Sequence, residues 1–148
     1  MSESATGAAK KRPEFRNINA FTDLPSYRLP IAGIVSILHR ISGFIMFILM
    51  PFIIWMFDNS ISSEISFGKF KSVFNLGALG LPGAIWKLLV LALIWAYLHH
   101  FIAGLRHLWM DTHHDAVSKE FGQSSAIATL AVSIGLALVL GAKLFGLY

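Results

Sequence analysis

The chain has 148 residues, of which 55% are hydrophobic and 14% are charged, and its mean hydropathy is +0.65. A soluble domain of this size exposes a large share of its area and cannot hide so much apolar surface. The formal net charge of +4 does not indicate nucleic-acid binding, because the basic residues lie near the ends of the apolar segments. The absence of cysteine from the sequence excludes disulfides and thiolate metal sites, so any iron–sulfur cluster must belong to another chain.

Three segments are long and apolar enough to cross a bilayer, which takes about 20 mostly apolar residues. They cover residues 31–57, 84–110 and 124–147. The sequence therefore predicts an all-α membrane protein whose three transmembrane helices form a domain of residues 31–148, after an N-terminal segment of residues 1–30. Eight Lys and Arg residues flank the spans on the side of the N-terminus and four lie on the other side, which predicts a cytoplasmic N-terminus.

The elements follow in a simple order along the chain. The N-terminal segment lacks the apolar stretch of a signal peptide and ends in DLPSYRLP, where two prolines predict an extended approach to the membrane. Pro51 predicts a kink in the first span. The connection over residues 61–83 is weakly amphipathic and then loop-like, and we expect it to lie along the outer surface. Trp86 and Lys87 are expected to anchor the start of the second span at the interface.

The end of the second span carries small and polar residues on one helix face, at intervals of four, three and four residues: His100, Gly104, His107 and Asp111. His99 and Arg106 belong to the adjacent stripe. His100 lies about 9 Å deeper than Arg106 at 1.5 Å per residue, below the headgroups, where a polar side chain needs a partner. Gly104 removes a side chain and lets a bulky group approach this face.

A second stripe begins the first span, and it consists of Ser36, Arg40, Gly43 and Phe47, with His39 beside Arg40. The two spans run in opposite directions, so the start of the first and the end of the second lie at one depth. We expect six polar side chains to converge there, near the inner leaflet: Ser36, His39, Arg40, His100, Arg106 and His107. Two converging stripes indicate the walls of a binding site.

The chemistry of these side chains suits a haem. A neutral imidazole in apolar surroundings is a good axial ligand for haem iron, which makes His100 the candidate ligand. The two haem carboxylates need cations, which Arg and His side chains near the interface can supply. Without cysteine the haem is expected to be bound non-covalently, as type b, and its second axial ligand to come from another subunit. Ser36 and Arg40 can also hydrogen-bond the carbonyl of a quinone whose tail stays in lipid.

The histidines also have simpler structural interpretations. His99 can be the ligand in place of His100, or it can hydrogen-bond a neighbouring helix. His107 can anchor the helix end at lipid phosphates. His113 and His114 lie beyond the helix in a polar link, which favours solvated loop positions.

The other candidates are open to the same kind of explanation. Arg106 can bind lipid phosphates at the helix end, and Ser36 can hydrogen-bond a carbonyl of its own helix. Gly43 and Gly104 suit close helix packing without any cofactor. The residue pattern alone leaves both the functional and the structural interpretations open.

Two motifs, SILHRISG at Ser36–Gly43 and HFIAGLRHLWMD at His100–Asp111, resemble the cytochrome b subunit of succinate dehydrogenase, respiratory complex II. Arg12-Pro13 and LPSYRLP are similar to that family too, so the resemblance covers nearly the whole chain. It implies a membrane anchor in the inner membrane of a bacterium, catalytic only within a four-subunit complex. The partners would be a flavoprotein that oxidises succinate, an iron–sulfur subunit and a second small anchor subunit.

The resemblance also implies roles for individual residues. The haem-ligating His of the family's His-x-x-x-Gly-(Ile/Leu)-Arg-His motif falls on His100, and the quinone-contacting Ser and Arg fall on Ser36 and Arg40. His39 falls where the family approaches the haem propionates. The chain would thus hold haem b and help pass electrons to ubiquinone near the cytoplasmic face. His99 directly precedes the expected ligand, but neighbours on a helix point about 100° apart and do not face one iron easily.

Three other functions are alternatives to this one. A structural anchor without haem would still dock a soluble enzyme and contact quinone. The equivalent subunit of fumarate reductase would carry the same motifs, since sequence does not fix the direction of the reaction. A transporter or channel subunit is disfavoured, because the charged groups gather at one interface and do not mark a path across the bilayer.

Overall fold

The computed structural model describes residues 19, 21–23, 25–114 and 117–148. Its helices are α1 (Ile31–Ile48), α2 (Met50–Ile61), α3 (Glu64–Asn75), α4 (Gly83–Thr112) and α5 (Lys119–Leu144). Within the described residues the one β feature is an isolated bridge between Ala78 and Leu81, so the predicted all-α fold is confirmed. Most of the predicted N-terminal segment, with Arg12 and Pro13, lies outside the described residues.

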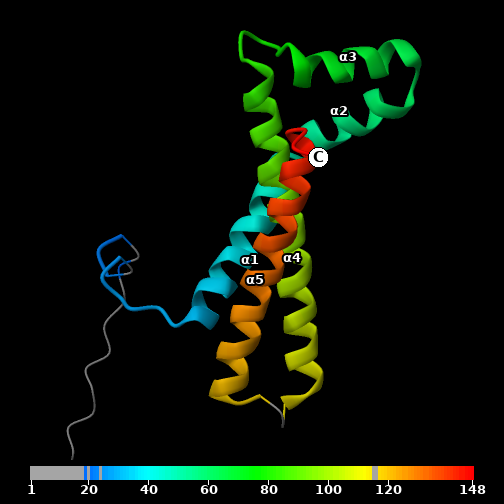
Figure 1. Cartoon of the computed structure of the whole chain (residues 1–148). Coiled ribbons are helices and arrows are strands. Elements are labelled where there is room, and N and C mark those ends of the chain that lie inside the picture. The colour runs from blue at the N-terminus through cyan, green and yellow to red at the C-terminus, as the bar shows by residue number, and fades with distance from the viewer. Residues whose placement is uncertain (1–18, 20, 24, 115–116) are drawn as a thin grey trace, which may run out of the picture.

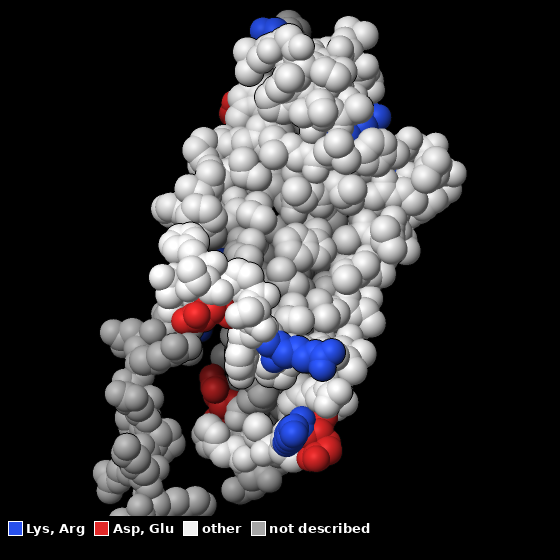
Figure 2. All heavy atoms as spheres, turned by 90° about the vertical axis from the view of Figure 1, so that its left-hand side faces the viewer, with Lys and Arg blue, Asp and Glu red and all other residues white. Residues whose placement is uncertain are grey.

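Three of the helices, α1, α4 and α5, form a bundle in which each is long and apolar enough to cross a membrane (Figure 1). The 18 residues of α1 make about 27 Å of helix, and the 30 residues of α4 make about 45 Å. Because the hydrocarbon core is about 30 Å thick, α4 extends beyond it. Figure 2 shows the described charged side chains mostly towards the two ends of the molecule, with an almost uncharged surface between them.

The predicted first span, residues 31–57, is divided between two helices instead of forming one. α1 ends at Ile48, Leu49 lies between the helices, and α2 begins at Met50 with Pro51 in its first turn. Proline suits that position because the first N–H groups of a helix have no partner within it. The predicted kink at Pro51 is thus a full break, after which α2 leaves the bundle at an angle (Figure 1).

The connection between the first two spans contains a helix, α3, which packs against α2 and the start of α4. Its start is fixed by a capping box, in which Ser63 and Ser66 exchange hydrogen bonds with each other's backbone N–H groups. The following loop turns through Gly77 at φ +105° and Leu79 at φ +53°. Trp86 donates a hydrogen bond from Nε1 to the Ala78 carbonyl at 3.3 Å, which ties this loop to α4.

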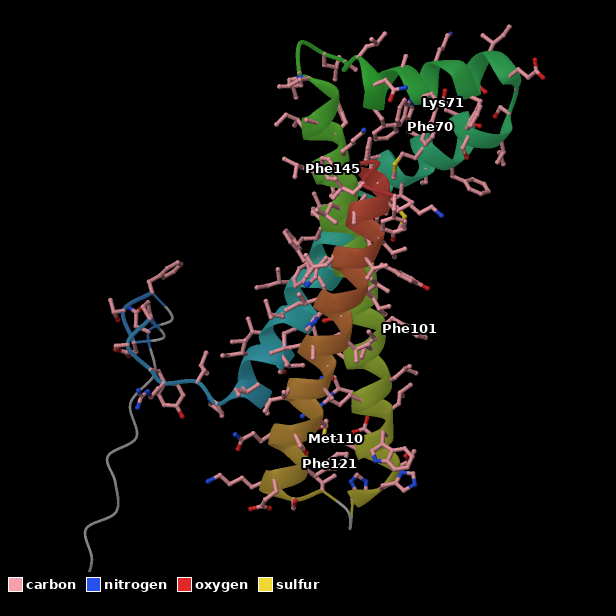
Figure 3. All side chains as sticks on the ribbon, viewed as in Figure 1. Phe70, Lys71, Phe101, Met110, Phe121 and Phe145 are labelled. Carbon is pink, nitrogen blue, oxygen red and sulfur yellow. The ribbon has the colours of Figure 1, made fainter. Side chains whose placement is uncertain are left out.

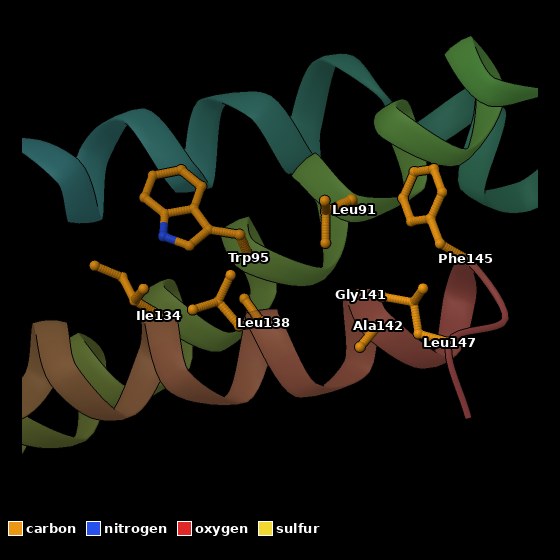
Figure 4. Close-up of a pocket in the computed structure, with 9 residues that line it drawn as sticks. Leu91, Trp95, Ile134, Leu138, Gly141, Ala142, Phe145 and Leu147 are labelled. Atoms are coloured by element: carbon orange, nitrogen blue, oxygen red, sulfur yellow. The ribbon is translucent and has the colours of Figure 1, made fainter.

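Small side chains allow the three long helices to approach closely. Val35 of α1, Ala103 of α4 and Ala126 of α5 form the buried cluster where they meet. The buried face of α5 repeats every four residues beyond that point, as Thr129, Ser133, Ala137 and Gly141. Towards the other end, α4 and α5 leave an apolar groove of about 570 Å³ between them (Figure 4). Such small-residue interfaces are typical of membrane helices, where packing replaces the hydrophobic driving force.

Candidate functional site

The start of α1 and the end of α4 bring three histidine rings together. The His39 ring stacks on the His100 ring, with 4.2 Å between centroids and 25° between planes. The His107 ring lies 5.2 Å from the His39 ring, with 41° between planes. We call these three residues the histidine cluster. Two of the polar stripes in the sequence therefore meet at one depth, as the antiparallel arrangement predicted.

The hydrogen bonds of His100 indicate which ring nitrogen donates. Nδ1 of His100 lies 2.9 Å from the backbone oxygen of His39 and 3.4 Å from Oγ of Ser42. A backbone carbonyl only accepts hydrogen bonds, so Nδ1 carries a proton, and Nε2 takes no part in this contact. The Ser42 hydroxyl donates to the same carbonyl at 2.8 Å. The helix backbone of α1 thus fixes the orientation of His100.

The two glycines of the stripes differ in what surrounds them. A Cβ atom on Gly43 would lie only 2.9 Å from Cε1 of His100, so the ring occupies space that any side chain would take. A Cβ on Gly104 would meet a single atom, Nε2 of His39, at an ordinary 3.6 Å. Packing within this chain therefore explains the glycine at 43 but leaves the glycine at 104 without an explanation.

His99 points about 100° away from His100 around the axis of α4 and is closed off. Its side chain is 0% exposed, and its ring stacks on Trp95 at 5.4 Å. Nδ1 of His99 lies 3.2 Å from Oγ of Ser133 on α5, which in turn donates to the Leu130 carbonyl. His100, by contrast, is half-buried. The expected hydrogen bond from His99 to a neighbouring helix is therefore present, while Nε2 of His99 is buried without a hydrogen-bond partner among the described residues.

Arg106 is not brought to the histidine cluster. Its Nε donates to Oγ of Ser125 at 2.9 Å and its Nη2 to the Gly122 carbonyl at 3.1 Å, both on α5. The expected convergence of six polar side chains is thus incomplete for a physical reason. Arg106 follows His99 by seven residues, so it shares the α5-facing side of α4 and not the side of His100.

Ser36 and Arg40 lie on α1 beside the cluster, half-buried and exposed respectively. The Ser42 hydroxyl bonds back to its own helix, whereas none of the hydrogen bonds among the described residues involves the Ser36 hydroxyl. The simpler interpretation of Ser36 as a self-bonded residue is therefore not the one seen here. His113 and His114 are exposed, and His113 stacks on Trp109 at 3.9 Å.

Sequence reasoning missed three hydroxyl groups that hold the site together: Ser42, Ser125 and Ser133. Ser42 supports His100, and the other two join α4 to α5 through Arg106 and His99. A signal was present, because Ser125, Thr129 and Ser133 recur every four residues in the third span. Small polar residues at that spacing are typical of a helix–helix interface in membranes.

Comparisons with known proteins agree with this geometry. Residues 10–140 match the family model described as succinate dehydrogenase/fumarate reductase transmembrane subunit. The chain belongs to this family. The family that its two motifs resemble is thereby confirmed, and the multi-pass membrane architecture is consistent with it.

Two curated relatives are named succinate dehydrogenase cytochrome b556 subunit. The one from Coxiella burnetii is 38% identical over 89 residues, which cover 60% of this chain and 66% of the relative. The one from Paracoccus denitrificans is 33% identical over 118 residues, which cover 78% of this chain and 83% of the relative. The first alignment thus spans just under two thirds of that relative's length, and the second most of it.

Proposed function

We propose that this family member is the haem b-binding anchor subunit of a succinate:quinone oxidoreductase in a bacterial inner membrane, with its N-terminus in the cytoplasm. It would help pass electrons from an iron–sulfur subunit to ubiquinone. The observation that carries the proposal is the geometry of His100, whose ring is half-buried and directs Nδ1 to the His39 carbonyl at 2.9 Å, which leaves Nε2 for a ligand bond. The name of the two relatives, which contains cytochrome b556, supports a haem of type b.

The residues of this face fit a haem in two respects. A histidine that binds a metal almost always donates its other ring N–H to a carbonyl, carboxylate or water, as His100 does. Gly104 shares the face of His100, and its missing side chain leaves space that nothing in this chain fills closely. Among the described residues no group of three His, Asp or Glu is placed to hold a metal ion.

The haem propionates are assigned to two members of the histidine cluster and the arginine beside it: His39, His107 and Arg40. Nε2 of His39 is buried and has no hydrogen-bond partner among the described residues. A buried polar atom left unpaired costs about 1–3 kcal/mol, so a carboxylate from outside the chain would stabilise it. Arg106 was also a candidate, but its hydrogen bonds to α5 assign it a role in joining α4 to α5.

The quinone is assigned to Ser36 and Arg40. The serine hydroxyl and the guanidinium lie one helical turn apart on α1, and both can donate hydrogen bonds to a quinone carbonyl oxygen. Donation to the oxygen favours the reduced quinone, because its negative charge grows as electrons arrive. Haem would supply a one-electron redox centre when it is bound, and the residues of this chain would orient the haem and its ligand.

The partners follow from the same proposal. A flavoprotein and an iron–sulfur subunit would dock at the cytoplasmic end, and a second small anchor subunit would cover the face of the histidine cluster and supply the other axial ligand. The family description also names fumarate reductase, and that description supports the equivalent subunit of the reverse enzyme as a second candidate.

The test compares two adjacent histidines in the assembled complex. We expect His100→Leu to abolish the reduced-minus-oxidised haem b spectrum, because the axial ligand is lost. His99→Leu should retain the spectrum and reduce thermal stability, because only the hydrogen bond to Ser133 is removed. Loss of haem in the His99 variant alone would overturn the ligand assignment. A wild-type complex that shows no haem spectrum would leave the haem-free anchor as the function.

A further inference from the structure

We propose that the chain binds an anionic phospholipid in a pocket at the end of the bundle opposite the histidine cluster. The pocket has a volume of about 320 Å³ and is formed by α2, α3, α4 and the end of α5. Two lysines from different helices line it, Lys71 of α3 and Lys87 of α4, together with Asn75. Its remaining walls are apolar: Met56, Phe70, Phe74, Val90 and Leu144.

Neither lysine is neutralised by the chain. The Lys71 ammonium lies 5.2 Å from the centre of the Phe67 ring, and the Lys87 ammonium lies 5.9 Å from that of Phe145. In the described part of the chain, neither forms an ion pair with a carboxylate. An aromatic face stabilises a cation by about 0.5–1 kcal/mol at an exposed site but leaves its charge uncompensated. The pocket therefore offers two positive charges to an anion.

The depth of the pocket indicates that the anion is a lipid headgroup. Lys87 is the fifth residue of α4, about 6 Å from the helix start, and α4 is longer than the hydrocarbon core. Figure 3 shows Phe70 and Lys71 on α3, beyond the end of α5 that carries Phe145. The site thus combines headgroup-level cations with apolar walls suited to acyl chains.

Net headgroup charge decides which lipid is preferred. A zwitterionic phospholipid brings its own ammonium group, which two lysines repel. A phospholipid with a net negative headgroup offers its phosphate without that opposing charge. A lysine near a membrane surface favours anionic lipid by about fivefold, so two lysines acting together should produce a clear preference.

The test measures lipid retained by the purified complex after washing in detergent with an equal mixture of phosphatidylglycerol and phosphatidylethanolamine. We expect mass spectrometry to find phosphatidylglycerol enriched in the wild-type complex. The double variant Lys71→Gln with Lys87→Gln should lower that enrichment by about fivefold or more. The matched control, Lys69→Gln with Lys143→Gln, removes the same charge at the same end from exposed side chains outside the pocket and should keep the enrichment.

Several outcomes would overturn the proposal. It fails if the wild-type complex shows no preference, or if the control variant loses it equally, because the effect would then be one of general charge. It also fails if inorganic phosphate alone displaces the lipid, since the apolar walls would then contribute nothing to lipid binding. If the glutamine variant does not assemble, Lys71→Arg with Lys87→Arg keeps both charges and must keep the preference.

Discussion

The two sides of α4 carry similar residues but have different environments. On the side that faces α5, His99 is fully buried and bonded to Ser133, and Arg106 is bonded to Ser125 and Gly122. On the side that faces α1, His100 and His107 are half-buried beside His39. Nε2 of His39 has no hydrogen-bond partner among the described residues. Nε2 of His99 also has no hydrogen-bond partner among the described residues, but this chain encloses His99 fully, whereas the histidine cluster is half-buried and remains open to a group from outside.

This difference shows how polar groups inside a membrane protein are divided between structure and function. A polar group in a bilayer must be satisfied, and a neighbouring helix can do this by itself when a hydroxyl lies opposite. Where the chain satisfies its own groups, a structural role is sufficient. Where the unpaired nitrogen belongs to a half-buried side chain, as at His39, we expect its partner to be a cofactor, a substrate or another subunit.

The largest effect is expected on the side of the histidine cluster. Arg40→Ala should lower ubiquinone reductase activity by about 10- to 100-fold, because a hydrogen bond from a charged donor contributes about 1.5–3 kcal/mol. Succinate oxidation with a soluble dye should persist. Arg28→Ala, which removes the same charge from an exposed residue before α1, should change neither activity. Unchanged ubiquinone turnover in the Arg40 variant would exclude the assigned role.

A smaller effect is expected at Gly104. Gly104→Leu should reduce haem occupancy of the complex about tenfold, because overpacking costs about 1–3 kcal/mol. A Cβ at this position meets only Nε2 of His39 at 3.6 Å, and a longer side chain would extend into the face assigned to the haem. Absorbance at the haem bands per mole of protein measures it. Gly135→Leu is the control, since a Cβ at Gly135 meets nothing within 4 Å. Full haem occupancy in the Gly104 variant would show that the haem does not approach this face.

The smallest effect is expected on the α5-facing side. Arg106→Gln should lower the free energy of unfolding by about 1–2 kcal/mol, because it weakens two hydrogen bonds to α5. The haem spectrum should not change. Thermal unfolding and the spectrum, recorded on one preparation beside Ser125→Ala, measure both quantities. Loss of haem with unchanged stability would instead place Arg106 at a propionate.

Much of the fold could be predicted from the sequence because the bilayer restricts the choices. Long apolar runs predicted three spans, and the helical spacing of polar residues placed His39 near His100. The break at Leu49 was harder to predict, since Pro51 is compatible with either a kink or a helix start. α3 was also missed, because its pattern is weakly amphipathic and its start depends on hydroxyl contacts between Ser63 and Ser66.

The candidate site was predicted in part. Spacing assigned His99 and His100 to different stripes, but it does not reveal which stripe a third helix covers. That depended on Ser133, whose hydroxyl takes the His99 hydrogen bond and lies 34 positions further along the chain. The placement of Arg106 depended likewise on Ser125. Long-range pairs of this kind follow from helix packing and not from local pattern.

The most direct test of the central claim is a cryo-EM density map of the assembled complex. The account predicts a porphyrin against the face of α4 that carries His100 and Gly104, with Nε2 of His100 bound to iron. His99 should remain bonded to Ser133 and distant from the metal. Porphyrin density on the α5-facing side with His99 as ligand, or only hydrocarbon beside His100, would contradict the account.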